Sequence, residues 1–205
     1  MRDWWLRTLL VLQRPHPVFV ALRESTPQSL GDRSEPVLAI VLLAGIAGVL
    51  STSAAGHLMD NPNAYDAIEV LVWAFIAGSI YGGFAFWAIG GLLARSSKAL
   101  GSEGTWRRSR HIVAFAAVPI ALSLVLWPVK LALYGGDLFR RGGSDAGTGD
   151  HVFSALLLVF VAWSAALLVI GVRAVHGWTW GRALAACTLA IVTPVVLGLA
   201  LSLLR

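Results

Sequence analysis

Histidine and carboxylate side chains gather in two stretches of the sequence, where they could in principle bind a divalent metal ion. They are, in chain order, His57, Asp60, Asp66 and Glu69, followed by Asp137, Asp145, Asp150 and His151. Imidazole and carboxylate groups are ordinary ligands of zinc and other divalent metals. Because their spacing matches no established ligand pattern, we interpret them as solvated loop charges and expect no metal site.

Motifs for catalysis and nucleotide binding are missing from the sequence. It contains no H-E-x-x-H zinc motif, no Walker phosphate loop and no G-x-S-x-G nucleophile elbow. The stretch GGSDAGTG at 142–149 is rich in glycine, but no strand is predicted before it, so we interpret it as a flexible loop. We therefore expect no catalytic residues and no cofactor.

The apolar residues are arranged in runs that are too long for the core helices of a soluble protein. Apolar residues make up 57% of the chain and charged residues only 13%, whereas about a quarter of a soluble domain is charged. Five runs, at about 37–55, 68–94, 112–134, 152–172 and 183–204, have roughly the twenty residues that a membrane-crossing helix needs. The sequence predicts an all-α integral membrane protein whose domain at 36–205 is a bundle of five transmembrane helices.

Basic residues are concentrated on one side of these predicted spans. Twelve of the sixteen Lys and Arg residues fall in three segments, at 1–35, 95–110 and 173–182. Basic loops stay in the cytoplasm, so the N-terminus is predicted inside and the C-terminus outside the inner membrane of a bacterial cell. The net charge of +5 is then explained by membrane topology, and nucleic acid is not an expected partner.

The first 35 residues form a separate cytoplasmic segment that begins MRDWWLRTLLVLQ. An apolar stripe with Trp4 and Trp5 beside a basic side predicts an amphipathic helix in the inner membrane interface. A second short helix is predicted near 17–24. The segment could serve as a membrane anchor or bind a partner.

Arginine and tryptophan side chains on the predicted cytoplasmic face are candidate contacts for anionic lipid headgroups or an acidic partner. These candidates are Trp4, Trp5, Arg107, Arg108, Arg110, Arg173, Trp178 and Trp180. The simpler interpretation is that the arginines only set the topology and that Trp178 and Trp180 only anchor the hairpin at 171–183.

Lys130 is the only clear charge near the interior of a predicted span, and Glu69 would lie near the same side of the membrane. An ionisable residue within the membrane is costly and is therefore a candidate for function. We favour a structural contact between Lys130 and Glu69, or a lysine side chain that reaches outward, over a proton pathway. Pro119, Pro128 and Pro194 should loosen their spans, which could open a cavity or merely shape the bundle.

The second predicted span has a face of small residues that includes Gly78 and Gly82. Small residues allow helix backbones to approach closely in lipid. Packing within the monomer is the usual meaning of such a face. A homo-oligomer or a partner helix is the second interpretation.

Three stretches carry a family resemblance. They are LQRPHPVFVAL ahead of the first span, LGSEGTWRRSRHIVAFAAVPIALSLV at 100–125 and WSAALLVIGVRAVHGWTWGRALAA at 163–186. Together they resemble the bacterial branch of the Yip-domain family, also called Ypt/Rab-interacting proteins. The resemblance implies five spans, a cytoplasmic N-terminus and no catalytic residues. Eukaryotic members are associated with Rab GTPases and vesicle traffic, but a bacterial chain ordinarily lacks Rab partners, so that activity is not carried over.

The sequence therefore predicts a non-enzymatic scaffold or partner-binding protein that organises the membrane through its cytoplasmic face. The alternative is a small-solute or lipid transporter or channel with a cavity near Lys130. The repeated halves of many transporters are missing, which counts against that alternative. Loss of solute flux on Lys130→Met would count in its favour.

Overall fold

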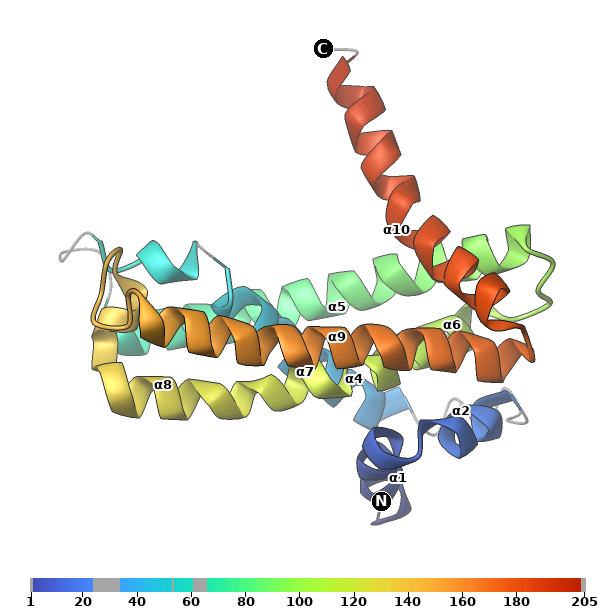
Figure 1. Ribbon diagram of the computed structural model, residues 1–205, viewed down its shortest axis with the longest axis horizontal. Helices are drawn as coiled ribbons and strands as arrows, with labels where there is room; N and C mark the ends of the chain where they lie inside the picture. The colour runs from blue at the N-terminus through green and yellow to red at the C-terminus, as the bar shows by residue number, and fades with distance from the viewer. Residues whose placement is uncertain (1, 24–33, 53, 61–65, 204–205) are drawn as a thin grey trace. The chain divides into compact units, whose positions relative to one another are not determined.

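The computed structural model describes residues 2–23, 34–52, 54–60 and 66–203, and helices are the only regular elements in those residues (Figure 1). The α-helices are α1 (Arg2–Gln13), α2 (Pro15–Arg23), α4 (Ser34–Leu50), α5 (Ala67–Ala99), α6 (Trp106–Ala116), α7 (Val118–Leu122), α8 (Leu126–Tyr134), α9 (Thr148–His176) and α10 (Trp180–Leu203). Short 3₁₀ helices are η1 (Ala55–His57), η2 (Ser123–Val125) and η3 (Gly135–Phe139). The predicted all-α fold class is confirmed.

Three helical stretches are long and apolar enough to cross a membrane, namely Ala67–Ala99, Trp106–Phe139 and Thr148–His176. They contain the second, third and fourth predicted spans. The first predicted span corresponds to a shorter apolar helix, Val37–Leu50. The fifth falls on α10, whose side chains are described only as far as Pro194. Five membrane crossings therefore remain a prediction.

The stretch from α6 to η3 is not one regular helix. A turn at Ala117 precedes Pro119, and the 3₁₀ segment η2 precedes Pro128. Proline lacks a backbone donor and its ring crowds the preceding turn, which explains why the regular pattern changes at these two points. The glycine after α8, Gly135, has a φ of 61°, and this left-handed conformation ends the helix.

The described residues belong to two compact units. Unit 1 is made from Met1–Val37, Ala85–Ala116 and Ala165–Arg205, and unit 2 from Leu38–Phe84 and Ala117–Ser164. Helices α5 and α9 contribute residues to both units, so each unit is described by itself below.

The core of unit 1 includes the short N-terminal helix α2. Phe19 of α2 is fully buried and its ring meets Phe115 of α6 edge to face, with ring centroids 6.4 Å apart. A Cβ atom on Gly171 of α9 would meet side-chain atoms of Ile112 and Phe19 at 2.8 and 2.9 Å, so a larger residue there would displace these side chains. The second short helix predicted in the N-terminal segment is therefore part of a packed core.

The core of unit 2 is built where α4, α5 and η3 meet. Its buried members are Leu50, Val70, Ala74, Leu138 and Phe139. The ring of Trp127 stacks on Phe139, with centroids 6.2 Å apart and an interplanar angle of 1°. Contact between these large apolar side chains holds α4, α5 and η3 together.

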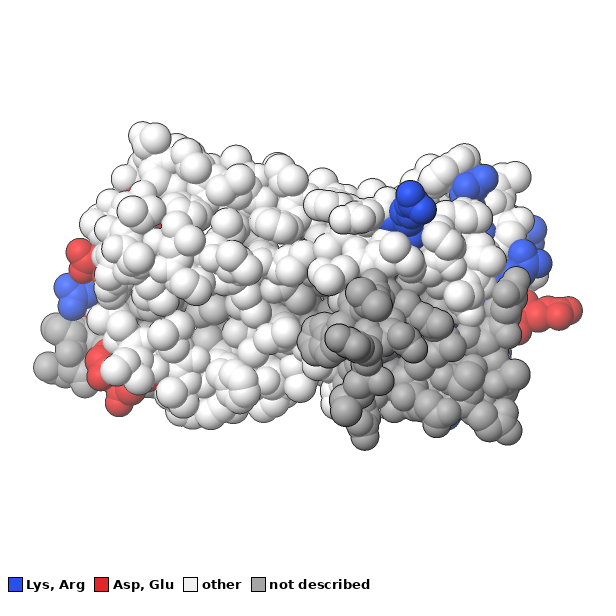
Figure 2. Space-filling view, turned by 90° about the horizontal axis from the view of Figure 1, so that it is seen from below, with Lys and Arg blue, Asp and Glu red and all other residues white. Residues whose placement is uncertain are grey.

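The helices also carry large apolar side chains that are exposed. Ile68 and Phe84 of α5 are each 72% exposed, and Leu158 of α9 is 65% exposed. Among the described residues on the face that Figure 2 shows, uncharged side chains predominate. Such surfaces suit contact with lipid chains, which agrees with the length and composition of the helices.

Candidate functional site

Four arginines of unit 1 each place the guanidinium group over a tryptophan ring. The pairs, with the distance from Cζ to the ring centroid, are Arg95–Trp106 at 5.5 Å, Arg110–Trp87 at 3.9 Å, Arg173–Trp180 at 4.5 Å and Arg182–Trp178 at 4.5 Å. A cation over an aromatic face gains roughly 0.5–1 kcal/mol at an exposed site. Tryptophan and arginine together are typical of the headgroup layer of a membrane.

Arg110 differs from the other three because it is packed between helices. A Cβ atom on Gly90 of α5 would overlap the Arg110 side chain, and a Cβ atom on Gly91 would meet the Trp106 ring at 2.7 Å. The two glycines thus make room on α5 for side chains from α6. Arg110 therefore has a packing role, whatever its charge contributes.

The loop between α5 and α6 is tied to the end of α9. Ser102 Oγ and His176 Nδ1 are hydrogen-bonded at 2.9 Å, and the Gly104 amide donates to Ser102 Oγ at 2.8 Å. The imidazole of His176 also stacks on Trp178, with centroids 4.6 Å apart. These contacts join the loop, the end of α9 and the hairpin that follows it.

Arg182 ties the beginning of α10 to the same loop. Its Nε donates a hydrogen bond of 3.1 Å to the Leu100 carbonyl oxygen, and its Nη2 donates to the same oxygen. Gly101 follows with a φ of 80°, the left-handed conformation that lets the chain turn away from α5. The loop and the hairpin at 171–183 therefore form one connected surface.

The balance of charged side chains differs between the two units. Unit 2 contains the three ion pairs found among the described residues, namely His57–Asp60 at 3.8 Å, Lys130–Asp145 at 3.5 Å and Arg140–Asp137 at 3.6 Å. In unit 1, Glu103 is the one carboxylate whose side chain is described, and it is exposed. The described part of unit 1 thus has an excess of basic side chains.

Lys130 of α8 is largely buried in unit 2. Its side chain and that of Asp145 are each 14% exposed. The Lys130 ammonium lies 5.3 Å from the ring centroids of both Trp127 and Phe153. An ammonium group that has lost most of its water is stabilised by a carboxylate and by aromatic faces.

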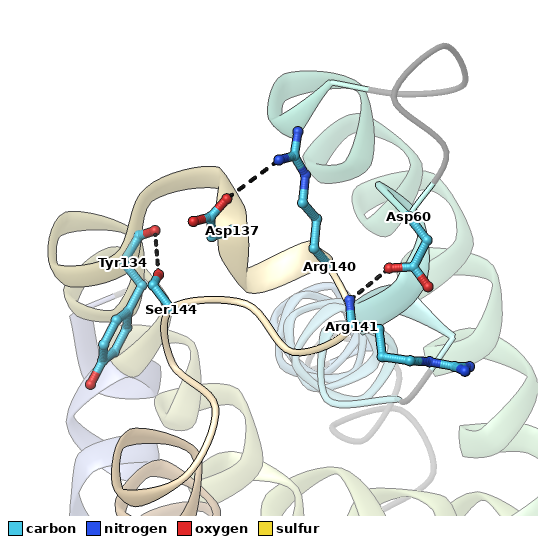
Figure 3. Close-up of polar contacts among 6 residues, drawn as sticks. All are labelled: Asp60, Tyr134, Asp137, Arg140, Arg141 and Ser144. Carbon is cyan, nitrogen blue, oxygen red and sulfur yellow. Dashed lines mark hydrogen bonds and ion pairs between the residues drawn. The ribbon is translucent and has the colours of Figure 1, made fainter.

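The turns around η3 in unit 2 are held together by backbone and carboxylate contacts (Figure 3). The Arg141 amide donates to Asp60 Oδ1 at 2.6 Å, and the Ser144 hydroxyl donates to the Tyr134 carbonyl oxygen at 3.2 Å. Asp137 pairs with Arg140 in the same region. These contacts fix the loop that carries Asp145.

A cavity of about 510 Å³ lies within unit 2 beside Lys130. Its wall combines apolar side chains of α8 and α9 with charged side chains of the loop that follows η3. The volume falls within the roughly 300–1,000 Å³ of small-molecule sites.

The sequence matches the Yip1 domain family over residues 9–202. The chain belongs to the Yip1-domain family. No curated protein and no solved structure gives a match. The predicted family is therefore confirmed over almost the entire chain, and this Yip1-domain protein is a membrane protein with helices that can cross a bilayer.

The structure gives Lys130 and Glu69 different partners from the ones we expected. Lys130 pairs with Asp145. Glu69 and Asp66 form a reciprocal cap at the beginning of α5, in which each carboxylate accepts from the other residue's amide, at 3.0 and 2.8 Å. The expected Lys130–Glu69 contact is wrong, because the cap uses Glu69 locally and the loop supplies a nearer carboxylate.

The remaining candidate residues of this Yip1-domain protein differ in their exposure. Arg107 is exposed, while Arg108 and Arg173 are half-buried, and all three belong to unit 1. The side chains of Trp4 and Trp5 lie outside the described part of the structure. Sequence reasoning missed Ser102 and His176 as a linked pair, since only the folded loop brings them together.

The candidate packing glycines Gly78 and Gly82 lie against α4 within unit 2. A Cβ atom on Gly78 would overlap the Ile46 backbone, and one on Gly82 would overlap the Val41 carbonyl oxygen. The helix backbones are thus in direct contact.

Proposed function

We propose that this Yip1-domain protein is a non-enzymatic membrane-organising protein that binds anionic lipid headgroups and a protein partner through a basic face on unit 1. We define the basic face by its exposed members, Arg95, Lys98, Arg107 and Arg182. The half-buried Arg108 and Arg173 lie in the same unit. The observation that carries the proposal is the excess of basic side chains in the described part of unit 1, where Glu103 is the one described carboxylate.

Anion binding follows from that excess. Each Lys or Arg near an anionic leaflet contributes about 1 kcal/mol of attraction. In unit 2, Lys130 and Arg140 have carboxylate partners at 3.5 and 3.6 Å. On the basic face, Arg95 and Arg182 lie over tryptophan rings, and Arg182 also donates to the Leu100 carbonyl oxygen. Guanidinium groups in such contacts can still bind phosphate or carboxylate groups from outside the chain.

The orientation that we propose keeps the basic face in the cytoplasm. It rests on the positive-inside rule applied to the loop at 95–110 and the hairpin at 171–183. With five crossings, the N-terminal segment would then be cytoplasmic and the C-terminus outside the inner membrane. The stacked tryptophans of unit 1 would lie at the headgroup level.

Native mass spectrometry of retained lipids tests the proposal. The purified protein is offered an equal mixture of phosphatidylglycerol and phosphatidylcholine in uncharged detergent. The wild type should retain phosphatidylglycerol preferentially, and the triple variant Arg95→Gln, Lys98→Gln, Arg107→Gln should lower that preference at least about tenfold, since three charges are lost. Arg110 is left unchanged because it packs against Trp87.

The matched control is the double variant Arg140→Gln, Arg141→Gln in unit 2, whose side chains are also exposed. It removes basic charge from the other unit and should leave the lipid preference intact. Equal preference in the wild type and in a correctly folded triple variant would sink the proposal.

The second candidate function, transport of a small solute or lipid, is supported by the cavity beside Lys130. Transport requires more than a binding cavity, because the ligand must also reach both sides of the membrane. It predicts protein-dependent uptake of a labelled organic anion by liposomes, which Lys130→Met abolishes. Equal uptake by liposomes with and without the protein would exclude transport of that anion.

A further inference from the structure

The lining of the cavity in unit 2 combines two kinds of side chain. Leu126, Trp127, Phe153 and Leu157 are apolar or aromatic. Lys130 and Asp145 are charged, as are several residues of the loop after η3. A molecule that suits both kinds of side chain carries a charged group and an apolar body.

The ion pair of Lys130 shows which kind of charged group binds its ammonium. The carboxylate oxygen Oδ2 of Asp145 lies 3.5 Å from Lys130 Nζ, and both side chains are largely buried. The ammonium also lies over the rings of Trp127 and Phe153, at 5.3 Å from each ring centroid. A carboxylate is therefore the native occupant of this position, and Asp145 supplies it from within the chain.

Asp145 can leave Lys130 by a change in its own side chain. The backbone of the loop is held in place, because the Asp145 carbonyl oxygen accepts from the Asp150 amide at 2.8 Å and the Ser144 hydroxyl donates to the Tyr134 carbonyl oxygen. An aspartate side chain moves its carboxylate by turning between staggered rotamers. A ligand carboxylate can therefore take the place of Asp145 at Lys130 without a change in the path of the loop.

We propose that this cavity binds an amphipathic carboxylate, a molecule with one carboxylate group and an apolar tail, and that the carboxylate replaces Asp145 at Lys130. The apolar tail lies against the apolar and aromatic part of the lining, which includes Trp127 and Phe153. Asp145 is then an internal competitor, which occupies Lys130 when no ligand is present. This inference goes beyond the proposed function and does not depend on the basic face of unit 1.

A monocarboxylate suits the cavity better than other charged groups. A cationic ligand would meet the Lys130 ammonium, and a neutral one would leave no group to replace Asp145. Arg140 and Arg141 also line the cavity, but their side chains are exposed, whereas that of Lys130 is 14% exposed. A charge that is shielded from water interacts more strongly, so Lys130 is the principal anion-binding group, and it balances a single negative charge.

Equilibrium dialysis of radiolabelled decanoate against the full-length protein in phosphatidylcholine nanodiscs tests the proposal, with empty nanodiscs as the blank. Wild-type protein should bind decanoate saturably, and unlabelled decanoate should compete while decanol does not. Lys130→Met should weaken binding at least about tenfold, because a hydrogen bond to a charged group is lost.

The companion variant Asp145→Asn separates a binding site from a structural ion pair. It removes the competitor and keeps the ammonium, so decanoate should bind several times more tightly than in the wild type. Glu69→Gln is the matched control, since it removes a carboxylate of unit 2 that does not line the cavity, and glutamine can still accept from the Asp66 amide. Decanoate should bind to it as to the wild type.

Two results would overturn the proposal. One is an absence of saturable decanoate binding by a folded wild-type protein. The other is weaker binding in Asp145→Asn, because a purely structural pair would be damaged by either substitution. Neither result bears on the lipid preference of the Arg95→Gln, Lys98→Gln, Arg107→Gln variant, so the function proposed for the basic face is judged separately.

Discussion

Gly45 of α4 lies directly against Gly78 of α5, so closely that a Cβ atom on Gly45 would overlap the Gly78 carbonyl oxygen. The same added atom would lie 2.6 Å from the backbone of Gly82. In lipid, where apolar side chains gain little from leaving the solvent, such backbone contact is a main source of helix association. The two helices of unit 2 therefore depend on the absence of side chains at these positions.

Gly45→Ala should destabilise the protein by roughly 1–3 kcal/mol, because the added methyl group meets backbone atoms that cannot move aside. The thermal midpoint of unfolding in mild detergent measures the effect. Gly83→Ala is the control, since a Cβ atom on Gly83 meets nothing within 4 Å. Its midpoint should be unchanged or slightly raised, and equal losses in both variants would refute the packing argument.

The Lys130–Asp145 pair should be energetically coupled more strongly than the exposed pairs of the same unit. A double-mutant cycle with Lys130→Met and Asp145→Asn should give a coupling of about 1–2 kcal/mol, since both side chains are shielded from water. The His57–Asp60 pair is 41% and 39% exposed. Its cycle should give less than about 0.5 kcal/mol. A larger coupling for His57–Asp60 would contradict the burial assigned to Lys130.

Ser102→Ala should release the loop between α5 and α6 from α9. The variant loses the bonds to His176 and to the Gly104 amide, and each bond is worth about 0.5–1.5 kcal/mol. Hydrogen exchange at residues 101–105 should therefore accelerate. In Ser96→Ala, the lost bond runs only to Leu93 within α5. That control should leave the exchange of the loop unchanged, and matching behaviour of the two variants would argue against the tie to α9.

Membrane orientation can be read by cysteine labelling in intact cells. Cys187 is the single cysteine of the chain, so a Cys187→Ala variant has no native thiol that could react. In that background, Ala146→Cys should react with a membrane-impermeant maleimide, whereas Glu103→Cys should react only after the membrane is opened. Both positions are exposed in their own units. The reversed pattern would place the basic face outside the cell and contradict the proposed orientation.

The sequence predicted the second, third and fourth spans because membrane crossing leaves a strong local signal. A run of roughly twenty apolar residues can satisfy its backbone only as a helix in lipid. Lys130 could be singled out for the same reason, as a charge within such a run. Its partner could not, because several carboxylates were expected on the same side, and only the path of the loop after η3 decides that Asp145 reaches Lys130.

The contacts of the basic face depend even more on the fold. Arginines and tryptophans were recognisable as membrane-interface residues, but the sequence does not show which ring lies under which guanidinium. Arg110 was a candidate for lipid contact, yet the glycines of α5 leave a space in which it packs. Ser102 and His176 are far apart in the chain, so only the positions of α6 and α9 in unit 1 bring them to 2.9 Å.

Site-specific photocrosslinking in native membranes tests the central claim, that the protein acts through the basic face, most directly. A photoreactive amino acid is placed at Glu103 in unit 1 or at Ala146 in unit 2, and the products are extracted in polymer discs for mass spectrometry. The account predicts that the probe at Glu103 captures a defined protein or anionic lipid, and that Arg95→Gln, Lys98→Gln, Arg107→Gln lowers the yield. Capture of the same species from Ala146, or an unchanged yield in the triple variant, would contradict it.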